Sequence, residues 1–201
     1  MMMCRRKWFG MLSIGWSFVI CLGCLNRVPP TAYYTLSSMA EKKEVVDAKG
    51  IGRYVIGLGP LALPDYLDRP YIVTRVSPNQ VAVNEGYRWA GALQSEALRV
   101  IATNMEILTH ARQVVTFPWG ITIEPDVRIR IDIQAFEGNL GGKAQLKAVW
   151  SLTRRQWEQP VMQRVSEIET SVNGDDFDSL AQAMGELLAD LSQQMAEAVS
   201  K

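Results

Sequence analysis

One alternation of apolar and polar side chains constrains the fold more than any other stretch of this chain. It runs from Val127 to Phe136 in the sequence VRIRIDIQAF. One side carries Val127, Ile129, Ile131 and Ile133, and the other carries Arg128, Arg130, Asp132 and Gln134. Because successive side chains of a β-strand point to opposite faces, the pattern predicts a strand with one buried face and one exposed face.

Further apolar runs predict the partners of this strand. They are Thr31–Leu36, Arg53–Leu58, Tyr71–Val76, Gln80–Asn84, Gln113–Phe117, Ala144–Thr153 and Val161–Thr170. The turn Ser77-Pro78-Asn79 predicts a hairpin between two of them, and Gly59-Pro60 is expected to end another. Neighbouring strands joined by short turns favour an antiparallel meander.

Two segments have helical periodicity. Apolar side chains from Trp89 to Met105 recur every three or four residues, which predicts a helix that follows Glu85 and ends near Asn104. A longer helix is expected after Gly174, with Asp175 or Asp176 as its N-cap and an apolar face of Phe177, Leu180, Ala181, Met184, Leu187, Leu188, Leu191 and Met195. The predicted fold is therefore α+β, a two-layer domain whose mostly antiparallel sheet is packed by two main helices.

The N-terminal residues have the features of a bacterial secretion signal. Arg5, Arg6 and Lys7 precede an uncharged segment of 15 residues, Trp8–Leu22, which is shorter than the ~20 residues of a spanning helix. The segment ends in Cys21-Leu22-Gly23-Cys24, and Gly-Cys is the end of a lipobox. We expect cleavage before Cys24 and covalent lipid on its thiol, with an ordinary signal peptide or an uncleaved anchor as the alternative. Leu25 is not the Asp that retains lipoproteins in the inner membrane, so the outer membrane is the expected destination, with the domain facing the periplasm.

These features divide the chain of 201 residues into three parts. Residues 1–23 are the expected signal peptide, 24–50 a lipid-anchored tether with a short strand, and 51–201 a periplasmic α+β domain. Ser37–Lys49 is rich in charge and is expected to be an exposed loop. Without the signal the chain has 18 basic and 21 acidic side chains, a balance that disfavours nucleic-acid binding.

The residues give little support for catalysis or for a bound cofactor. His110 is the only histidine, no GxSxG motif accompanies it, and it follows the first predicted helix, where a surface histidine is expected. The part after residue 23 has one cysteine, so it lacks a Cys/His cluster for a metal and a partner for a disulfide. Gly138–Gly142 lacks the Gly-Lys-Ser/Thr ending of a phosphate-binding loop. We expect a protein that is not an enzyme and has no cofactor.

Two charged places remain as candidates for contact with a protein partner. The turn between two prolines and the segments that follow it contain Asp65, Tyr66, Asp68, Arg69, Arg75, Arg88 and Trp89. Arg, Tyr and Trp are common anchors of interfaces, which favours partner docking. A salt-bridged turn and a packed helix start explain the same residues without a partner, and this structural explanation is the favoured one.

Several motifs follow one another along the chain. They are Tyr34-Thr35-Leu36, Leu63–Pro70 (LPDYLDRP), Ile72-Val73, Arg75, Asn84-Glu85, Arg88-Trp89-Ala90, Leu93, the strand 127–136 with Glu137-Gly138, the strand around Trp150 and the helix 177–191. Their order resembles the PqiC-like auxiliary lipoproteins of phospholipid transport systems. Gly91 departs from the family, whose members often have an acid there.

The resemblance implies an outer-membrane lipoprotein that works with an MCE-domain protein and its membrane permease in lipid traffic between two membranes. It implies a docking role, with a homo-oligomer as an open possibility. A structural envelope lipoprotein that binds cell wall or an assembly machine is the alternative. A continuous apolar pocket between sheet and helices would instead indicate a lipid carrier.

Overall fold

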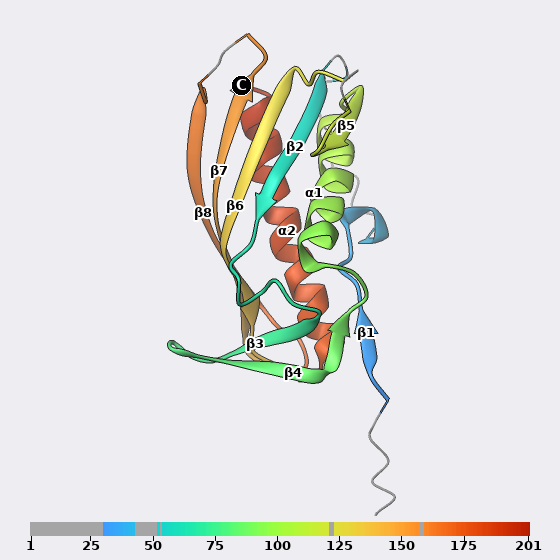
Figure 1. Ribbon diagram of the computed structural model, residues 1–201, viewed down its shortest axis with the longest axis vertical. Helices are drawn as coiled ribbons and strands as arrows, with labels where there is room; N and C mark the ends of the chain where they lie inside the picture. Colours follow the sequence, from blue (N-terminus) through green and yellow to red (C-terminus); the bar gives the residue numbers. More distant parts are fainter. Residues whose placement is uncertain (1–29, 43–51, 53, 121–122, 157–158) are drawn as a thin grey trace, which may run out of the picture.

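The strand expected at residues 127–136 is the central strand of one mixed sheet in the computed structural model of the chain (Figure 1). The structure describes residues 30–42, 52, 54–120, 123–156 and 159–201. β6 (Val127–Gly138) pairs antiparallel with β7 (Lys143–Arg154), and β7 pairs antiparallel with β8 (Met162–Ser171). Along its other edge β6 pairs in parallel with β2 (Val55–Ala62) and, at its last residue, with β3 (Tyr71–Ser77).

Three further strands complete the sheet in the described part of the chain. β4 (Gln80–Trp89) forms the predicted hairpin with β3, β1 (Ala32–Tyr34) lies parallel to β4, and β5 (Gln113–Thr116) lies parallel to β2. The α+β class is confirmed, and so is the meander for β6, β7 and β8. The parallel pairings of β1, β2 and β5 were not expected, because parallel neighbours are separated by long connections that leave no local turn signal.

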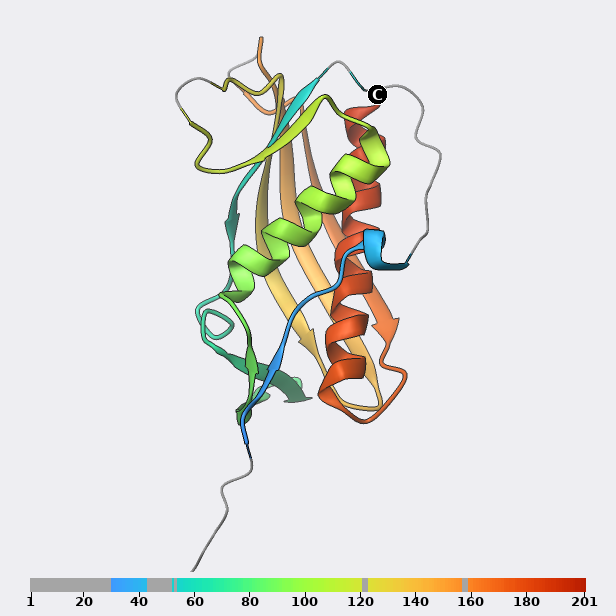
Figure 2. The same ribbon diagram turned by 90° about the vertical axis from the view of Figure 1, so that its right-hand side faces the viewer.

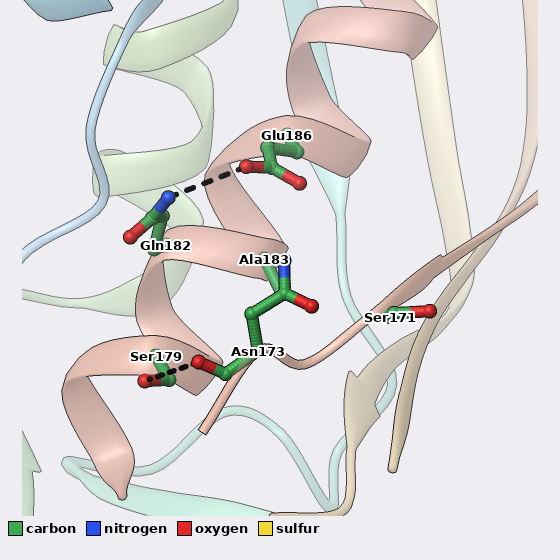
Figure 3. Close-up of a pocket in the computed structure, with 6 residues that line it drawn as sticks. All are labelled: Ser171, Asn173, Ser179, Gln182, Ala183 and Glu186. Atoms are coloured by element: carbon green, nitrogen blue, oxygen red, sulfur yellow. Dashed lines mark hydrogen bonds between the residues drawn. The ribbon is translucent and has the colours of Figure 1, made fainter. Parts of the chain in front are cut away.

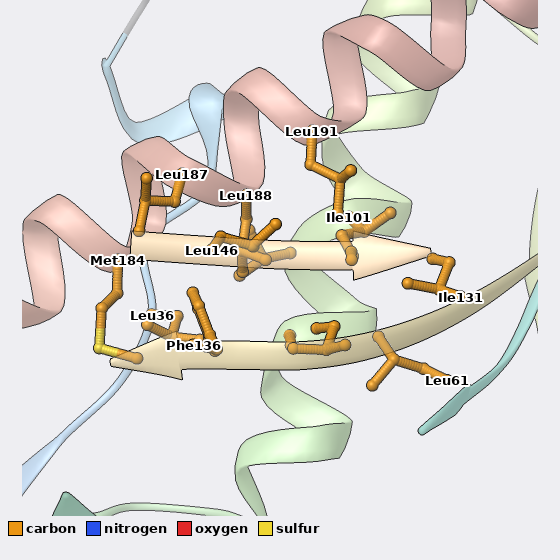
Figure 4. Packing of buried hydrophobic residues seen from close by; sticks show 14 of the residues in the cluster. Leu36, Leu61, Ile101, Ile131, Phe136, Leu146, Met184, Leu187, Leu188 and Leu191 are labelled. Carbon is orange, nitrogen blue, oxygen red and sulfur yellow. The ribbon is translucent and has the colours of Figure 1, made fainter. Parts of the chain in front are cut away.

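Two helices cover one face of the sheet, as Figure 2 shows. They are α1 (Leu93–Thr109) and α2 (Phe177–Val199), and the side chain of the predicted N-cap Asp176 accepts a hydrogen bond of 2.7 Å from the backbone N–H of Ser179. Between the two layers lie fully buried side chains of β6, β7 and both helices (Figure 4), among them Ile131, Phe136, Leu146, Ile101, Leu187, Leu188 and Leu191. These side chains fill the space between the sheet and α2.

The first helix begins and ends later than its periodicity predicted. Trp89 and Glu85 belong to β4, where Arg88 is the register partner both of Tyr71 on β3 and of Tyr33 on β1. Strand pairing on both sides therefore overrides the helical spacing of the apolar residues. At the other end the helix continues to Thr109 because the turn after Asn104 is also buried.

Gly59-Pro60 does not end its strand. β2 runs through both residues, and its register with β6 is irregular between Leu58 and Leu61. Proline has no backbone N–H to donate and is tolerated in sheets at such irregularities. The expected break is therefore a bulge within a longer strand.

The expectation of an exposed loop at Ser37–Lys49 is wrong at Ser38 and Met39. Ser38 and Met39 are buried, and Met39 begins a short 3-10 helix, η1 (Met39–Lys42). The backbone N–H of Met39 donates to Oδ1 of Asn104 in α1 at 2.8 Å, which compensates for its burial. Residues 43–49 of this loop, and Cys24 with the expected signal 1–23, lie outside the described residues.

Candidate functional site

The end of β6 carries a fully buried carboxylate, that of Glu137. Its Oε1 accepts hydrogen bonds from Nη2 of Arg75 at 2.6 Å and from Nε2 of Gln145 at 3.0 Å. Its Oε2 accepts from the hydroxyl of Tyr66 at 2.7 Å and from the backbone N–H of Phe136 at 2.9 Å. Nε of Arg75 also donates to Oε1 at 3.1 Å, so five hydrogen bonds reach one carboxylate that has no exposure to water, as a buried charge requires.

A register shift in β6 explains why Glu137 lies where it does. The pairing with β7 is irregular between Ile133 and Ala135, and beyond this bulge Phe136 takes the buried position on the helix side. A bulge adds one residue to a strand and reverses the alternation that follows it. Glu137 is consequently directed to the opposite side, toward Tyr66 and Arg75.

The bonds around Glu137 set the charge state of the cluster. Burial by itself raises the pKa of Glu137, but the hydrogen bonds from Tyr66, Arg75 and Gln145 outweigh it and hold that pKa below its usual range. Burial and the bond to Glu137 raise the pKa of Tyr66, and the same carboxylate raises the pKa of Arg75. The stable state is thus a carboxylate, a neutral phenol and a guanidinium, with every oxygen of the acid occupied by donors.

Tyr66 and Arg75, two residues of the predicted docking set, therefore point inward and bind the same acid, Glu137. Tyr66 belongs to the turn after β2 and Arg75 to β3, so the cluster ties this turn and the hairpin to the end of β6. In the sequence, Glu137 belongs only to a family pattern, and no role was predicted for it. The signal that was available is the acid directly after the point where the apolar alternation of the strand breaks down.

Trp89 and Arg88 of the docking set also have partners within the chain. Trp89 is 4% exposed and belongs to the core, and its backbone N–H donates to the carbonyl of Pro70. The guanidinium of Arg88 lies over the ring of Tyr71, 4.6 Å from its centroid, and Nη2 donates to the Tyr71 hydroxyl at 3.0 Å. A cation over an aromatic ring is held by the negative ring face.

The remaining members of the set lie in the turn itself. Asp65 and Asp68 are exposed and Arg69 is half-buried. The turn is closed by backbone bonds from Leu67 to Pro64 and from Asp68 to Asp65. The side chains of Asp65 and Asp68 thus remain at the surface, while the apolar Leu67 between them is buried.

The base of the tether is fixed to the body by several contacts. Beyond β1, Leu36 is buried in the core and its carbonyl accepts from Nη2 of Arg99 at 2.9 Å. The backbone of the next residue, Ser37, lies so close to α2 that a Cβ on Gly185 would be 2.8 Å from its carbonyl oxygen. The chain that would lead to the lipid is therefore part of the folded body from β1 onward.

Aromatic rings gather where β1 meets β4. Tyr87 stacks on Phe177 with 3.8 Å between ring centroids, and Tyr34 lies about 6 Å from both. Tyr33, which points to the other side of β1, is 63% exposed. In Figure 1 β1 lies at the end of the molecule opposite to the start of β2 and the end of β7.

That opposite end has a hollow of about 450 Å³ lined by Tyr54, Glu124, Asp126, Val127, Arg154 and Arg155. Several of its polar groups have partners: Arg155 pairs with Glu124 at 2.7 Å, and Asp126 accepts from the backbone N–H of Val55 at 2.8 Å. A second hollow, beside the first turns of α2 (Figure 3), is lined by Ser171, Asn173, Ser179, Gln182, Ala183 and Glu186. Its volume of about 10 Å³ has room for roughly one water molecule.

His110 is exposed at the C-terminal end of α1, where it adopts a left-handed backbone conformation with φ of 46°. This agrees with the expected surface position. Within the described residues no three His, Cys, Asp or Glu side chains are grouped so that they could hold a metal ion. No helix in the same part of the chain has the length and apolar character needed to cross a membrane.

Comparison with family models shows to which protein family the chain belongs. Residues 34–196 match the model described as ABC-type transport auxiliary lipoprotein component. The chain belongs to this family. The resemblance to PqiC-like lipoproteins is thereby confirmed, and the family is one of lipoproteins that serve as auxiliary components of transport. None of the curated proteins compared with the chain matches it.

Two solved structures share the fold. An uncharacterized protein superposes with a TM-score of 0.68 at 18% identity, over 85% of this chain and 99% of that one. A Xanthomonas campestris protein assigned to the family model DUF330 superposes with a TM-score of 0.66 at 16% identity, over 82% of this chain and 92% of that one. At such identities the likeness shows that the fold is shared, and it does not extend to activity.

Proposed function

We propose that this auxiliary lipoprotein is anchored in the outer membrane through lipid on Cys24 and docks an MCE-domain protein of a phospholipid transport system. The observation that carries the proposal is the family match over residues 34–196 together with the Gly23-Cys24 signal. The role is mechanical, without catalysis and without a cofactor other than the covalent lipid. The membrane permease of the same system is the second expected partner.

The packing supports a docking role over lipid carriage. The space between sheet and helices is occupied by large side chains such as Phe136, Trp150 and Leu188, each buried to within 1%. A lipid acyl chain would have to displace them, at a cost similar to that of overpacking a core. The exposed acids Asp65 and Asp68 remain proposed docking residues, because the cluster around Glu137 holds their turn in one orientation.

Acylation is tested first. Cys24→Ser removes the thiol that would carry lipid, so metabolic labelling with a radioactive fatty acid should give a labelled parent and an unlabelled variant. Cys21→Ser is the matched control, since it should leave labelling intact. Labelling of the Cys24→Ser variant would contradict the lipoprotein part of the proposal.

Docking is tested by crosslinking in cells followed by affinity capture and mass spectrometry. The parent chain should recover an MCE-domain protein, and Asp65→Lys with Asp68→Lys should recover several-fold less while the domain stays folded. Glu167→Lys with Glu169→Lys on β8, two other exposed acids, is the charge-matched control. Recovery of only cell-wall or assembly proteins would favour the structural envelope lipoprotein.

A further inference from the structure

The end of the molecule at β1 is close to the membrane if Cys24 carries lipid, so the inference below rests on the proposed anchoring. Cys24 precedes Ala32, the first residue of β1, by eight positions. A fully extended chain of this length spans at most about 30 Å. Because β1 and the segment after it are fixed to β4 and the helices, this end of the body can reach the headgroups easily.

Two arginines at this end have a guanidinium nitrogen that the protein does not satisfy. The Nε atoms of Arg69 and Arg88 are buried and have no hydrogen-bond partner among the described residues, so a phosphate at the surface would be bound by the outer guanidinium nitrogens. Neither side chain forms an ion pair in the described part of the chain, whereas Arg128, whose Nε is also unpaired, lies 3.6 Å from the carboxylate of Glu124. An Arg fork is suited to bind phosphate oxygens, because its donors are arranged in one plane.

The backbone holds the two arginines near each other and beside the tether. Trp89, next to Arg88, donates its backbone N–H to the carbonyl of Pro70, next to Arg69, at 2.9 Å. Tyr33 is the register partner of Arg88 on β1 and is 63% exposed. Exposed tyrosine beside arginine is typical of protein surfaces at the depth of lipid headgroups.

The charge of this end is mixed. Asp65, Asp68 and Glu85 are exposed in the same segments as the two arginines. A general attraction to an anionic surface is therefore not expected, and any attraction depends on local contact between guanidinium groups and phosphates. Tyr33 with the two guanidinium groups favours a lipid surface for these three side chains, while the proposed contact with a protein partner is made by Asp65 and Asp68 of the same turn.

We propose that the surface formed by Tyr33, Arg69 and Arg88 rests on the membrane that holds the anchor, with the two guanidinium groups bound to lipid phosphates. The contact orients the body, so that the end with the starts of β2 and β6 points away from the membrane. The lipid anchor supplies affinity, and this surface supplies a fixed orientation.

Two glycines allow the orientation to be measured on the lipidated protein. A Cβ on Gly86 in β4, or on Gly120 in the loop after β5, would meet nothing within 4 Å, so either position accepts a cysteine. With Cys24 blocked by lipid, each variant carries one thiol for a dye. The protein is reconstituted into vesicles of phosphatidylethanolamine and phosphatidylglycerol that contain a lipid with a quencher on its headgroup.

We expect the dye at residue 86 to be quenched about threefold more than the dye at residue 120, because contact with headgroups extends only ~5–10 Å from the surface. Arg69→Gln with Arg88→Gln should remove most of this difference. Arg112→Gln with Arg130→Gln, which removes two other exposed arginines, is the matched control and should leave it unchanged. Circular dichroism checks that the double variant is folded.

Equal quenching at the two positions overturns the proposal, and so does an unchanged difference in the Arg69→Gln, Arg88→Gln variant. An unquenched dye at residue 86 that crosslinks to an MCE-domain protein assigns the surface to a protein partner instead. If the chain bears no lipid, that result contradicts the proposed function but does not contradict the proposed orientation. In that case Cys24 is coupled to a maleimide lipid, and slower hydrogen exchange of β4 on vesicles is the expected result, with unchanged exchange as the contrary one.

Discussion

The middle and the end of β6 are held in place by opposite kinds of interaction. In the middle, Ile129, Ile131 and Ile133 are almost completely buried against the helix layer. At the end, Glu137 is buried to the same extent and is held by Tyr66, Arg75 and Gln145. Nine residues of one strand thus contain an apolar contact that tolerates any neighbour of suitable shape and a polar contact that specifies its neighbours.

The difference separates stability from orientation. Apolar burial contributes free energy in proportion to area and does not depend on direction. A buried carboxylate contributes less net free energy, because its desolvation offsets most of its attraction, but losing a donor is costly. The polar end of β6 therefore fixes how the turn at 65–70 and the hairpin are placed, while the apolar middle keeps the domain folded.

The largest effect is expected in the middle of the strand. Ile131→Ala should lower the free energy of unfolding by about 3 kcal/mol, since it removes buried methyl groups and leaves a cavity. Urea denaturation followed by tryptophan fluorescence measures the change. A loss below about 1 kcal/mol would mean that the sheet and α2 relax into the cavity, so that the middle of β6 is not rigidly packed.

A smaller loss is expected at the end of the strand. Glu137→Gln keeps the shape but removes the charge that Arg75 and Tyr66 face, and should lower the free energy of unfolding by about 2 kcal/mol. The same denaturation experiment applies, with Gln134→Glu on the exposed face of β6 as a control of surface charge. A variant as stable as the parent would show that the charge of Glu137 does not contribute to the stability of the domain.

Acid distinguishes the two regions more sharply than denaturant. Because the folded-state pKa of Glu137 is lowered, its contribution is present above the unfolded value of about 4.3 and is lost as pH falls through the folded value. The stability difference between parent and Glu137→Gln should therefore shrink below about pH 4, while the difference for Ile131→Ala should not. Unfolding measured at several pH values between neutral and strongly acidic gives the result. A parallel decline of both differences would contradict the role of the carboxylate.

The smallest effect is expected for an ion pair at the surface. Lys143 and Glu169 lie 2.8 Å apart, but both side chains are exposed and screened by water. Lys143→Gln should leave the urea midpoint unchanged within error, and added salt should make no difference. A clear shift would show that charge pairs in this protein contribute without burial, which would remove the contrast between Glu137 and the surface.

Prediction from the sequence succeeded where a local pattern decides the structure. The alternation at 127–133, the turn at Ser77-Pro78-Asn79 and the cap at Asp176 each depend on residues close in the chain. It was wrong where distant segments decide. The spacing of Trp89 assigned it to a helix, but its pairing with Tyr34 of β1 and its backbone bond to Pro70 keep it in β4. Tyr66 and Arg75 meet Glu137 across 71 and 62 residues of chain, a distance over which no spacing rule applies.

The parallel pairing of β1 with β4 has a mechanical consequence for a protein held by its N-terminal side. Backbone hydrogen bonds run across strands, so a pull along β1 loads its bonds to β4 together and in shear. Directly behind β1, the buried side chain of Leu36 and its carbonyl bond to Arg99 oppose the same displacement. Tension between a membrane and a docked partner would thus be transmitted into the sheet and both helices, and the attachment of the domain would yield only with its core.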